Sequence, residues 1–156
     1  MTTYRRRSKR LPAAKSGLAG LRVGYAVARP DIVTLLHKVR QPFNVTSLAQ
    51  VAAIAGLDDS VYVRKTLENN STGMAFLENG FERLGVAYVP SHTNFILTEV
   101  GDGLQVFNEL LKLGVIVRPM GGYGLPRHVR ISVGLDHENQ RVLTALEQVL
   151  SARAKK

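Results

Sequence analysis

Hydrophobic residues recur at helical spacing in the first half of the chain and at mixed strand and helix spacing in the second half. Steps of three and four residues predict helices at 30–39, 47–57 and 61–84, and Pro42 ends the first of them. The alanine-rich segment 47–57 is predicted to be buried. A short apolar run at 21–28 predicts a strand before these helices.

After Gly85 the pattern alternates between strands and helices. Strands are predicted at 86–89, 94–100, 115–118 and 128–133. Asp102 and Asp136 each precede an amphipathic run and are predicted to cap a helix. The order strand–strand–helix–strand–strand–helix predicts an α+β layer whose helices cover one face of the sheet.

The formal net charge of +9 comes from the two ends of the chain. The excess of basic side chains lies in the segments 5–15 and 153–156, while the residues between them include as many acidic as basic side chains. Charged tails of this kind are usually solvated. The distribution therefore disfavours a nucleic-acid-binding protein, although the charge alone would suggest one.

Composition excludes several further classes of protein. The chain has no cysteine, so disulfides and thiolate metal sites are ruled out, and its four histidines show no metal-ligand spacing. No apolar run approaches the roughly 20 residues needed to cross a bilayer. The basic leader lacks the apolar core of a secretory signal, so a cytoplasmic protein without metal is expected.

A glycine-punctuated turn places an arginine before the first predicted strand. The turn reads GLAGLRVG from Gly17 to Gly24 and contains Arg22. Glycine lets a backbone approach a ligand closely, and a guanidinium suits a phosphate. By itself the pattern is weak evidence, because most turns of this kind are only turns.

Two further arginines lie on predicted neighbouring strands. In the strand 128–133 the apolar residues alternate with Arg130, so its side chain faces away from them. Arg118 ends the preceding strand. Together the two side chains could bind a phosphate or carboxylate through charge-assisted hydrogen bonds.

From about residue 17 to residue 150 the chain resembles the C-terminal portion of histidinol-phosphate aminotransferases, which are fold-type I pyridoxal-phosphate-dependent enzymes. Six segments carry the resemblance in the order and spacing of the family. They are GLAGLRVGYA (17–26), QPFNVTSLAQ (41–50), LENNSTGMAFLENGFERLG (67–85), SHTNFIL (91–97), GVIVRPMGGYGLP (114–126) and HVRISVG (128–134).

The resemblance implies a fold of the α/β class with a mixed sheet, and it implies a division of the chain. Residues 1–16 would be a basic leader unlike the family, and residues 17–60 would be the last part of the large cofactor-binding domain. Residues 61–85 would form a helix between domains, and residues 86–152 the small C-terminal α+β domain. The front of the two-domain subunit would then be absent from this chain.

The resemblance also assigns roles to individual residues. Arg22 would bind the phosphate of pyridoxal 5'-phosphate. Arg130 would bind the anionic group of the substrate, Arg118 would be a second arginine on the substrate side, and Asn94 would contribute to the same site. A surface arginine or a turn asparagine is the plain alternative for each.

The catalytic lysine of the family is out of register in this chain. Counting back from Gly17, that lysine belongs at position 14, which is Ala14 here. Lys15 follows one residue later and is the candidate catalytic residue that remains. A one-residue slip in an extended segment turns a side chain to the opposite face, so Lys15 does not simply inherit the role.

The activity implied is pyridoxal-phosphate-dependent transfer of an amino group between histidinol phosphate and 2-oxoglutarate in histidine biosynthesis. An amino donor and a 2-oxo acid would be the partners, within a homodimer and without membrane or nucleic acid. Two alternatives remain: an aromatic amino-acid aminotransferase, and a non-catalytic truncated remnant. The position of Ala14 and the unrelated leader favour the remnant and predict negligible activity for the chain alone.

Overall fold

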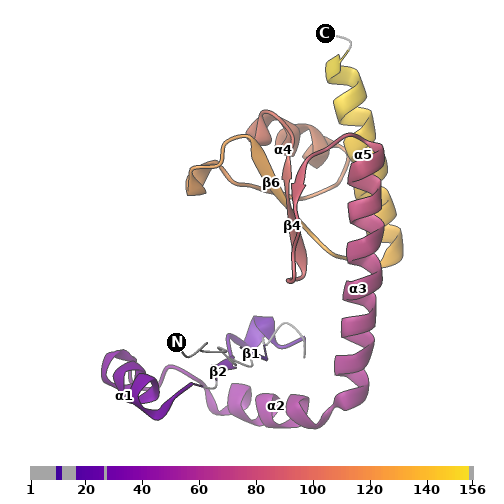
Figure 1. Cartoon of the computed structure of the whole chain (residues 1–156). Helices are drawn as coiled ribbons and strands as arrows, with labels where there is room; N and C mark the ends of the chain where they lie inside the picture. Colours follow the sequence, from indigo (N-terminus) through magenta and orange to yellow (C-terminus); the bar gives the residue numbers. More distant parts are fainter. Residues whose placement is uncertain (1–9, 12–16, 27, 155–156) are drawn as a thin grey trace, which may run out of the picture. The chain divides into compact units, whose positions relative to one another are not determined.

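The computed structural model describes residues 10–11, 17–26 and 28–154. It divides into two compact units, residues 1–67 and residues 68–156. The boundary falls within one long helix, α3 (Ser60–Arg83; Figure 1), so residues 60–67 of this helix belong to the first unit and residues 68–83 to the second. No described helix is long and apolar enough to span a membrane.

The first unit contains short strands and helices. Strand β1 (Arg10–Leu11) pairs antiparallel with β2 (Tyr25–Ala26), and the 3₁₀ helix η2 (Ala19–Leu21) lies between them in sequence. Helix α1 (Pro30–Val39) and helix α2 (Ser47–Asp58) follow. The strand predicted at 21–28 is thus reduced to two residues, because η2 and the left-handed backbone at Arg22 occupy its first part.

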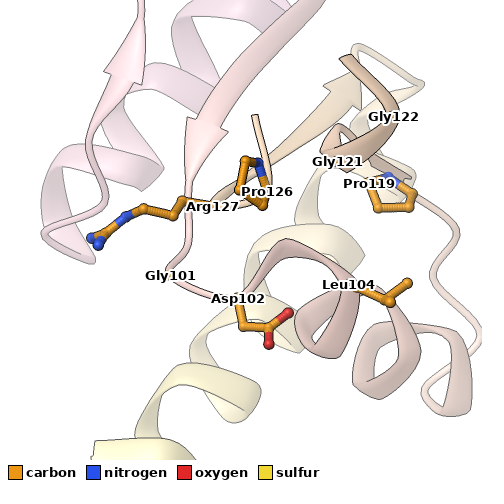
Figure 2. A pocket seen from close by; sticks show the side chains of 8 residues that line it. All are labelled: Gly101, Asp102, Leu104, Pro119, Gly121, Gly122, Pro126 and Arg127. Atoms are coloured by element: carbon orange, nitrogen blue, oxygen red, sulfur yellow. The ribbon is translucent and has the colours of Figure 1, made fainter. Parts of the chain in front are cut away.

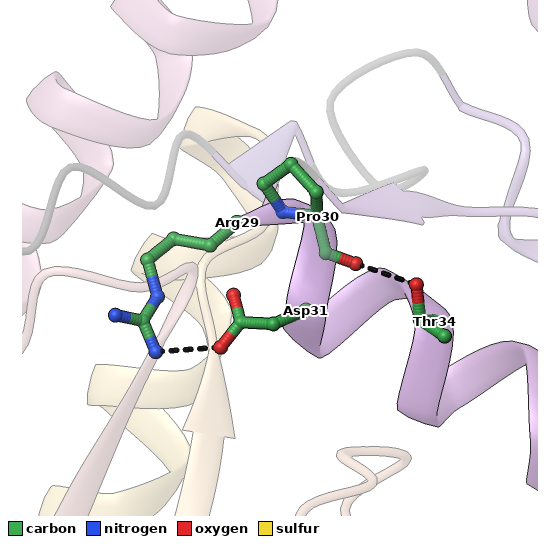
Figure 3. Close-up of polar contacts among 4 residues, drawn as sticks. All are labelled: Arg29, Pro30, Asp31 and Thr34. Atoms are coloured by element: carbon green, nitrogen blue, oxygen red, sulfur yellow. Dashed lines mark hydrogen bonds and ion pairs between the residues drawn. The ribbon is translucent and has the colours of Figure 1, made fainter.

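Side chains set the starts of these helices. Proline occupies the first position of α1, where its missing N–H costs nothing. Figure 3 shows two further contacts there: Arg29 pairs with Asp31 at 2.9 Å, and the Thr34 hydroxyl donates to the Pro30 carbonyl at 2.9 Å. The Thr46 hydroxyl caps α2 by accepting from the Ala49 N–H.

Most of α2 is exposed, contrary to the burial predicted for it. Only Ala49 is buried among its residues, and Leu48 is 79% exposed. Helix α2 has no continuous buried stripe because its apolar residues lie on all sides. The first half of α3 is similarly open, and its Leu67 is exposed.

The second unit is built on a four-stranded sheet. Its strands are β3 (Tyr88–Val89), β4 (Phe95–Glu99), β5 (Arg118–Pro119) and β6 (His128–Ser132). The order across the sheet is β3-β4-β6-β5, and every pair is antiparallel. Helix α4 (Gly103–Lys112), the 3₁₀ helix η3 (Gly121–Tyr123) and helix α5 (Asp136–Ala154) complete the unit.

The described strands do not form the mixed sheet that was expected. Strands β4 and β5 run in the same direction and are joined through α4, which is the connection that normally produces a parallel pair. Strand β6 lies between them and pairs antiparallel with both. Strand β6 therefore separates the two strands of this crossover, and the described strands form no parallel hydrogen bonds.

The core lies on one face of this sheet, as the alternation predicted. On β4 and β6 the inward residues are Ile96, Thr98, Val129 and Ile131. Helices cover them with a set of buried apolar side chains: Met74, Leu77 and Phe81 from α3, Val106 and Leu110 from α4, and Val142, Leu143, Leu146 and Val149 from α5. The opposite face of β4 and β6 is left half-open.

Helix α5 runs alongside the second half of α3 (Figure 1). The approach is close because α3 carries glycine at the contact. A Cβ at Gly73 would come within 2.5 Å of the Val133 side chain and 2.8 Å of the Asn139 amide. Gly73 therefore lets α3 pack against the loop that joins β6 to α5.

Candidate functional site

Arg22 stands at the end of η2 in a left-handed backbone conformation, with φ of 53°. A non-glycine residue there costs roughly 1 kcal/mol, which the surrounding structure must offset. Its Nη1 donates to the Ala19 carbonyl at 3.2 Å, and the side chain is exposed. The remaining N–H groups of this guanidinium make no hydrogen bond to the described residues, so they can bind a phosphate.

Arg130 occupies the open face of the sheet at the middle of β6. Its guanidinium carbon lies 4.9 Å from the centre of the Phe95 ring, and Phe95 begins β4. The Nε atom is buried and has no hydrogen-bond partner among the described residues. A buried donor without an acceptor is costly, so this atom is suited to an acceptor supplied from outside the chain.

Arg118 lies directly opposite Arg130 across the β5–β6 pair. It is exposed, its Nη2 donates to the Tyr123 hydroxyl at 3.0 Å, and its guanidinium carbon lies 5.5 Å from the Tyr123 ring centre. Like charges directly opposite one another destabilise a sheet. An arrangement that opposes stability and leaves donors open is typical of an anion-binding site.

No carboxylate neutralises this pair of arginines within the described part of the chain. Glu99, an acidic side chain on the same face of the sheet, accepts from Arg127 Nε at 2.8 Å. Leu97 is the partner of Arg130 on β4. The row Leu97–Arg130–Arg118 across three strands therefore presents two positive charges beside an apolar residue.

Asn94 contributes its backbone to the structure of this end of the sheet. Its carbonyl accepts from the Val133 N–H at 2.9 Å, and its side chain is exposed and makes no hydrogen bond to a described residue. A role for the Asn94 amide in ligand binding remains a prediction.

Two asparagines of α3 hold the same end of the sheet. Asn69 Nδ2 donates to the Gly134 carbonyl, which follows β6, and Asn70 Nδ2 donates to the Thr93 carbonyl, which precedes β4, both at 3.1 Å. Asn70 Oδ1 is buried without a partner among the described residues. The sequence pattern does not reveal a role for these two asparagines, for Phe95 or for Tyr123, because their contacts depend on strand register and on helix packing.

The proposed sites fall into separate parts of the chain. Arg118, Arg130 and Asn94 belong to the second unit, in which the two arginines are brought together. Arg22 belongs to the first unit and is described by itself. Ala14 and Lys15 lie outside the described residues.

A hollow of about 680 Å³ lies beside the start of α4 (Figure 2). Its lining includes Asp102, Leu104 and Pro119, and the Arg127 side chain extends away from the other lining residues. Neither Arg118 nor Arg130 lines it. The hollow is therefore distinct from the arginine pair. The described residues contain no group of three histidine or acidic side chains placed to hold a metal ion.

Residues 13–146 match the sequence profile of the family "Aminotransferase class I and II". The chain belongs to this family, which contains pyridoxal-phosphate-dependent transferases.

Individual proteins with a similar sequence are named histidinol-phosphate aminotransferases. The chain is 53% identical to histidinol-phosphate aminotransferase 2 of Ralstonia nicotianae over 139 residues, and 52% identical to the histidinol-phosphate aminotransferase of Akkermansia muciniphila over 134 residues. Each match covers 86% of this chain and 37% of the relative. The chain thus spans little more than a third of the length of these relatives.

The fold agrees with this relationship. The crystal structure of histidinol-phosphate aminotransferase from Sinorhizobium meliloti in complex with pyridoxal-5'-phosphate superposes with a TM-score of 0.66 at 26% identity. The match covers 88% of this chain and 39% of that chain. The predicted fold-type I aminotransferase class is confirmed, and so is the resemblance to histidinol-phosphate aminotransferases.

Proposed function

We propose that this chain supplies the substrate-anion site and part of the cofactor-phosphate site of an aminotransferase. The enzyme would exchange an amino group between histidinol phosphate and 2-oxoglutarate in histidine biosynthesis, as a cytoplasmic homodimer. The observation that carries the proposal is the pair Arg118 and Arg130, two opposed arginines that no described carboxylate neutralises.

The pair fits a phosphate monoester physically. Such a group carries nearly two negative charges near neutral pH and three acceptor oxygens. It can accept from both guanidinium groups at once and relieve the repulsion between them. A carboxylate of 2-oxoglutarate brings one charge to the same donors, so both substrates of the proposed exchange can use the site.

Arg22 fits the phosphate of pyridoxal 5'-phosphate. The N–H groups of Arg22 that bind no described residue lie at an exposed turn, and a guanidinium matches the geometry of phosphate oxygens. When bound, the cofactor supplies an electron sink for the carbon that exchanges its amino group. Arg22 would hold the cofactor, and Arg118 and Arg130 would orient the substrate.

The chain alone is expected to show negligible aminotransferase activity. The family's lysine position is Ala14, and proton transfer at the substrate carbon needs a correctly placed amine. A coupled assay with histidinol phosphate, 2-oxoglutarate and added pyridoxal 5'-phosphate should give the same background rate for the chain and for Lys15→Ala. Turnover that is lost in Lys15→Ala would show that Lys15 does act as the catalytic amine.

Substrate binding tests the arginine pair without requiring turnover. Histidinol phosphate should bind the chain in a calorimetric titration, and Arg130→Gln should weaken it by about tenfold or more, since a hydrogen bond to a charged group contributes about 1.5–3 kcal/mol. Arg118→Gln should weaken it less, because that guanidinium is exposed. Arg83→Gln removes an exposed arginine from the end of α3 in the same unit and should change nothing.

The same titration separates the alternatives. Phenylpyruvate binding as tightly as histidinol phosphate would favour the aromatic amino-acid aminotransferase. Absence of binding by either compound would contradict the proposed function and favour the non-catalytic remnant.

A further inference from the structure

The Arg130 side chain is in contact with an aromatic ring that the sequence pattern does not link to it. Phe95 pairs with Ser132 in the β4–β6 register, so it is a diagonal neighbour of Arg130 on the same face. The guanidinium carbon lies 4.9 Å above the ring centre. This is the distance of a cation–π interaction.

The Phe95 ring can offset two unfavourable features of the site around Arg130. The Nε of Arg130 is buried without an acceptor among the described residues, and Arg118 presents a like charge directly opposite. Both conditions favour a guanidinium that swings away from the site toward water. The negative face of an aromatic ring attracts the cation without occupying its in-plane N–H donors, so it can counter both.

Phe95 is itself firmly held. The Thr93 hydroxyl donates to the Phe95 carbonyl at 3.2 Å. The same hydroxyl accepts from the Phe95 backbone N–H, with 3.3 Å between nitrogen and oxygen. Asn70 fixes Thr93 in turn through its hydrogen bond to the Thr93 carbonyl. The ring is thus attached through the backbone to α3, and a rigid support of this kind can set the orientation of a neighbouring side chain.

We propose that Phe95 is a positioning residue for Arg130: its ring holds the guanidinium in one orientation and keeps the N–H donors available to an incoming anion. The orientation itself is a property of the free chain. Its effect on affinity rests on the proposed function, because that function supplies histidinol phosphate as the anion.

The test follows the Nε–H signal of Arg130 by nuclear magnetic resonance in the ¹⁵N-labelled full chain, assigned through its loss in Arg130→Gln. Three variants are compared. Phe95→Leu removes the ring but keeps an apolar side chain, and Phe95→Tyr keeps the ring. Tyr88→Leu is the matched control, because it removes another half-buried ring from the same sheet, on β3.

A ring beneath the guanidinium shifts the Nε–H signal upfield in the wild-type chain, and burial slows its exchange with water. Phe95→Leu should abolish both effects and weaken histidinol phosphate binding about fivefold, the equivalent of a cation–π interaction of about 1 kcal/mol. Phe95→Tyr should resemble the wild type in signal and in affinity. Tyr88→Leu should change neither.

Several results would overturn the assignment. An unshifted Nε–H signal in the wild-type chain would do so without any variant, and so would a Phe95→Leu chain that keeps the signal or the affinity. An equal effect of Tyr88→Leu would mean that general loosening, not the ring, is responsible. If the signal depends on Phe95 but the wild type binds no histidinol phosphate, Phe95 positions Arg130 and the proposed function is wrong.

Discussion

At the scale of single residues, the surroundings of Arg130 lower the stability of the second unit. The Nε donor is buried and has no partner in the part of the chain that the structure describes, and Arg118 faces it across the strand pair. Both features cost free energy in the absence of a ligand. Functional sites commonly retain such costs, because removing them removes the function as well.

Arg130→Met should therefore stabilise the chain. Methionine keeps a long apolar side chain beside Phe95, and it removes both the orphan donor and the opposed charge. The free energy of unfolding should rise by about 1 kcal/mol in a denaturant titration that follows the second unit, while histidinol phosphate binding disappears. Arg83→Met, at an exposed site, should stay within about 0.5 kcal/mol of the wild type. A less stable Arg130→Met chain would show that the arginine contributes to the fold.

The Tyr88 hydroxyl provides a pH-dependent contact between β3 and α3. It donates to Glu82 Oε1 at 2.9 Å, and this hydrogen bond, followed by burial and the negative charges of Glu82 and Glu78, raises the pKa of Tyr88 above 10.0. A raised pKa in the folded state means that the contribution to stability is complete below the unfolded pKa. It is lost as the pH rises through the folded value.

Ultraviolet titration of tyrosinate should detect this shift. One of the five tyrosines of the chain should ionise above the usual range, and Tyr88→Phe should remove that component. Alkaline pH should also destabilise the wild type more than it destabilises Tyr88→Phe. Equal alkaline losses in the two chains would exclude a coupling between this hydroxyl and folding.

At the scale of elements, the sequence predicted most helices because their spacing and caps are local. The predicted helix at 30–39 agrees with α1, and Asp102 caps α4 by accepting from the Gln105 N–H at 2.9 Å. Asp136 is the first residue of α5 and not its cap. The Glu138 carboxylate accepts from the Leu135 N–H just before α5.

Strands were less predictable because their extent depends on a partner. The predicted strand 115–118 is reduced to Arg118–Pro119, although Val115 and Val117 are buried and Ile116 is 80% exposed as alternation requires. Only residues opposite β6 complete the hydrogen-bonded ladder. Alternation along the strand predicted the face of the sheet on which Arg130 lies. Its contact with Phe95 could not be predicted, because that contact depends on the register between β4 and β6.

A substitution at Gly103 tests how α4 packs against β6. A Cβ at this first residue of α4 would lie 2.5 Å from the His128 carbonyl oxygen and 2.9 Å from the Pro126 carbonyl oxygen. Backbone atoms cannot move aside cheaply, so Gly103→Ala should lower the free energy of unfolding by about 2–3 kcal/mol. Gly122→Ala is the matched control, because a Cβ there would meet no atom of the described residues within 4 Å. Similar denaturation midpoints for the two variants would contradict this packing of α4 on β6.

At the scale of the whole molecule, the two units differ in how they bury apolar side chains. The second unit contains the continuous core on the sheet. In the first unit the apolar residues of α1 and α2 are mostly exposed, and Phe43 between them is 99% exposed. Exposed apolar surface of this extent promotes association with other chains. We therefore expect the chain to self-associate through residues 17–60.

The short strand β2 in that segment has a pairing partner. Strand β2 pairs with β1, which comes from the basic leader. The pairing extends over only two residues on each strand, however. A two-residue ladder outside a larger sheet adds little stability, so residues 17–60 are still expected to open before the second unit does.

Limited proteolysis with thermolysin, which cuts beside apolar residues, should reveal this difference. The first cuts should fall before residue 60, with the loop around Phe43 the most exposed target. A resistant fragment should begin within or after α3, because the buried residues of this helix all lie in its second half. Mass spectrometry of the fragments identifies both ends. Arg130→Met should lengthen the lifetime of the resistant fragment without changing the first cuts, since it stabilises only the second unit. Early cuts within residues 86–150, with the segment 17–60 intact, would mean that the first unit is the stable one.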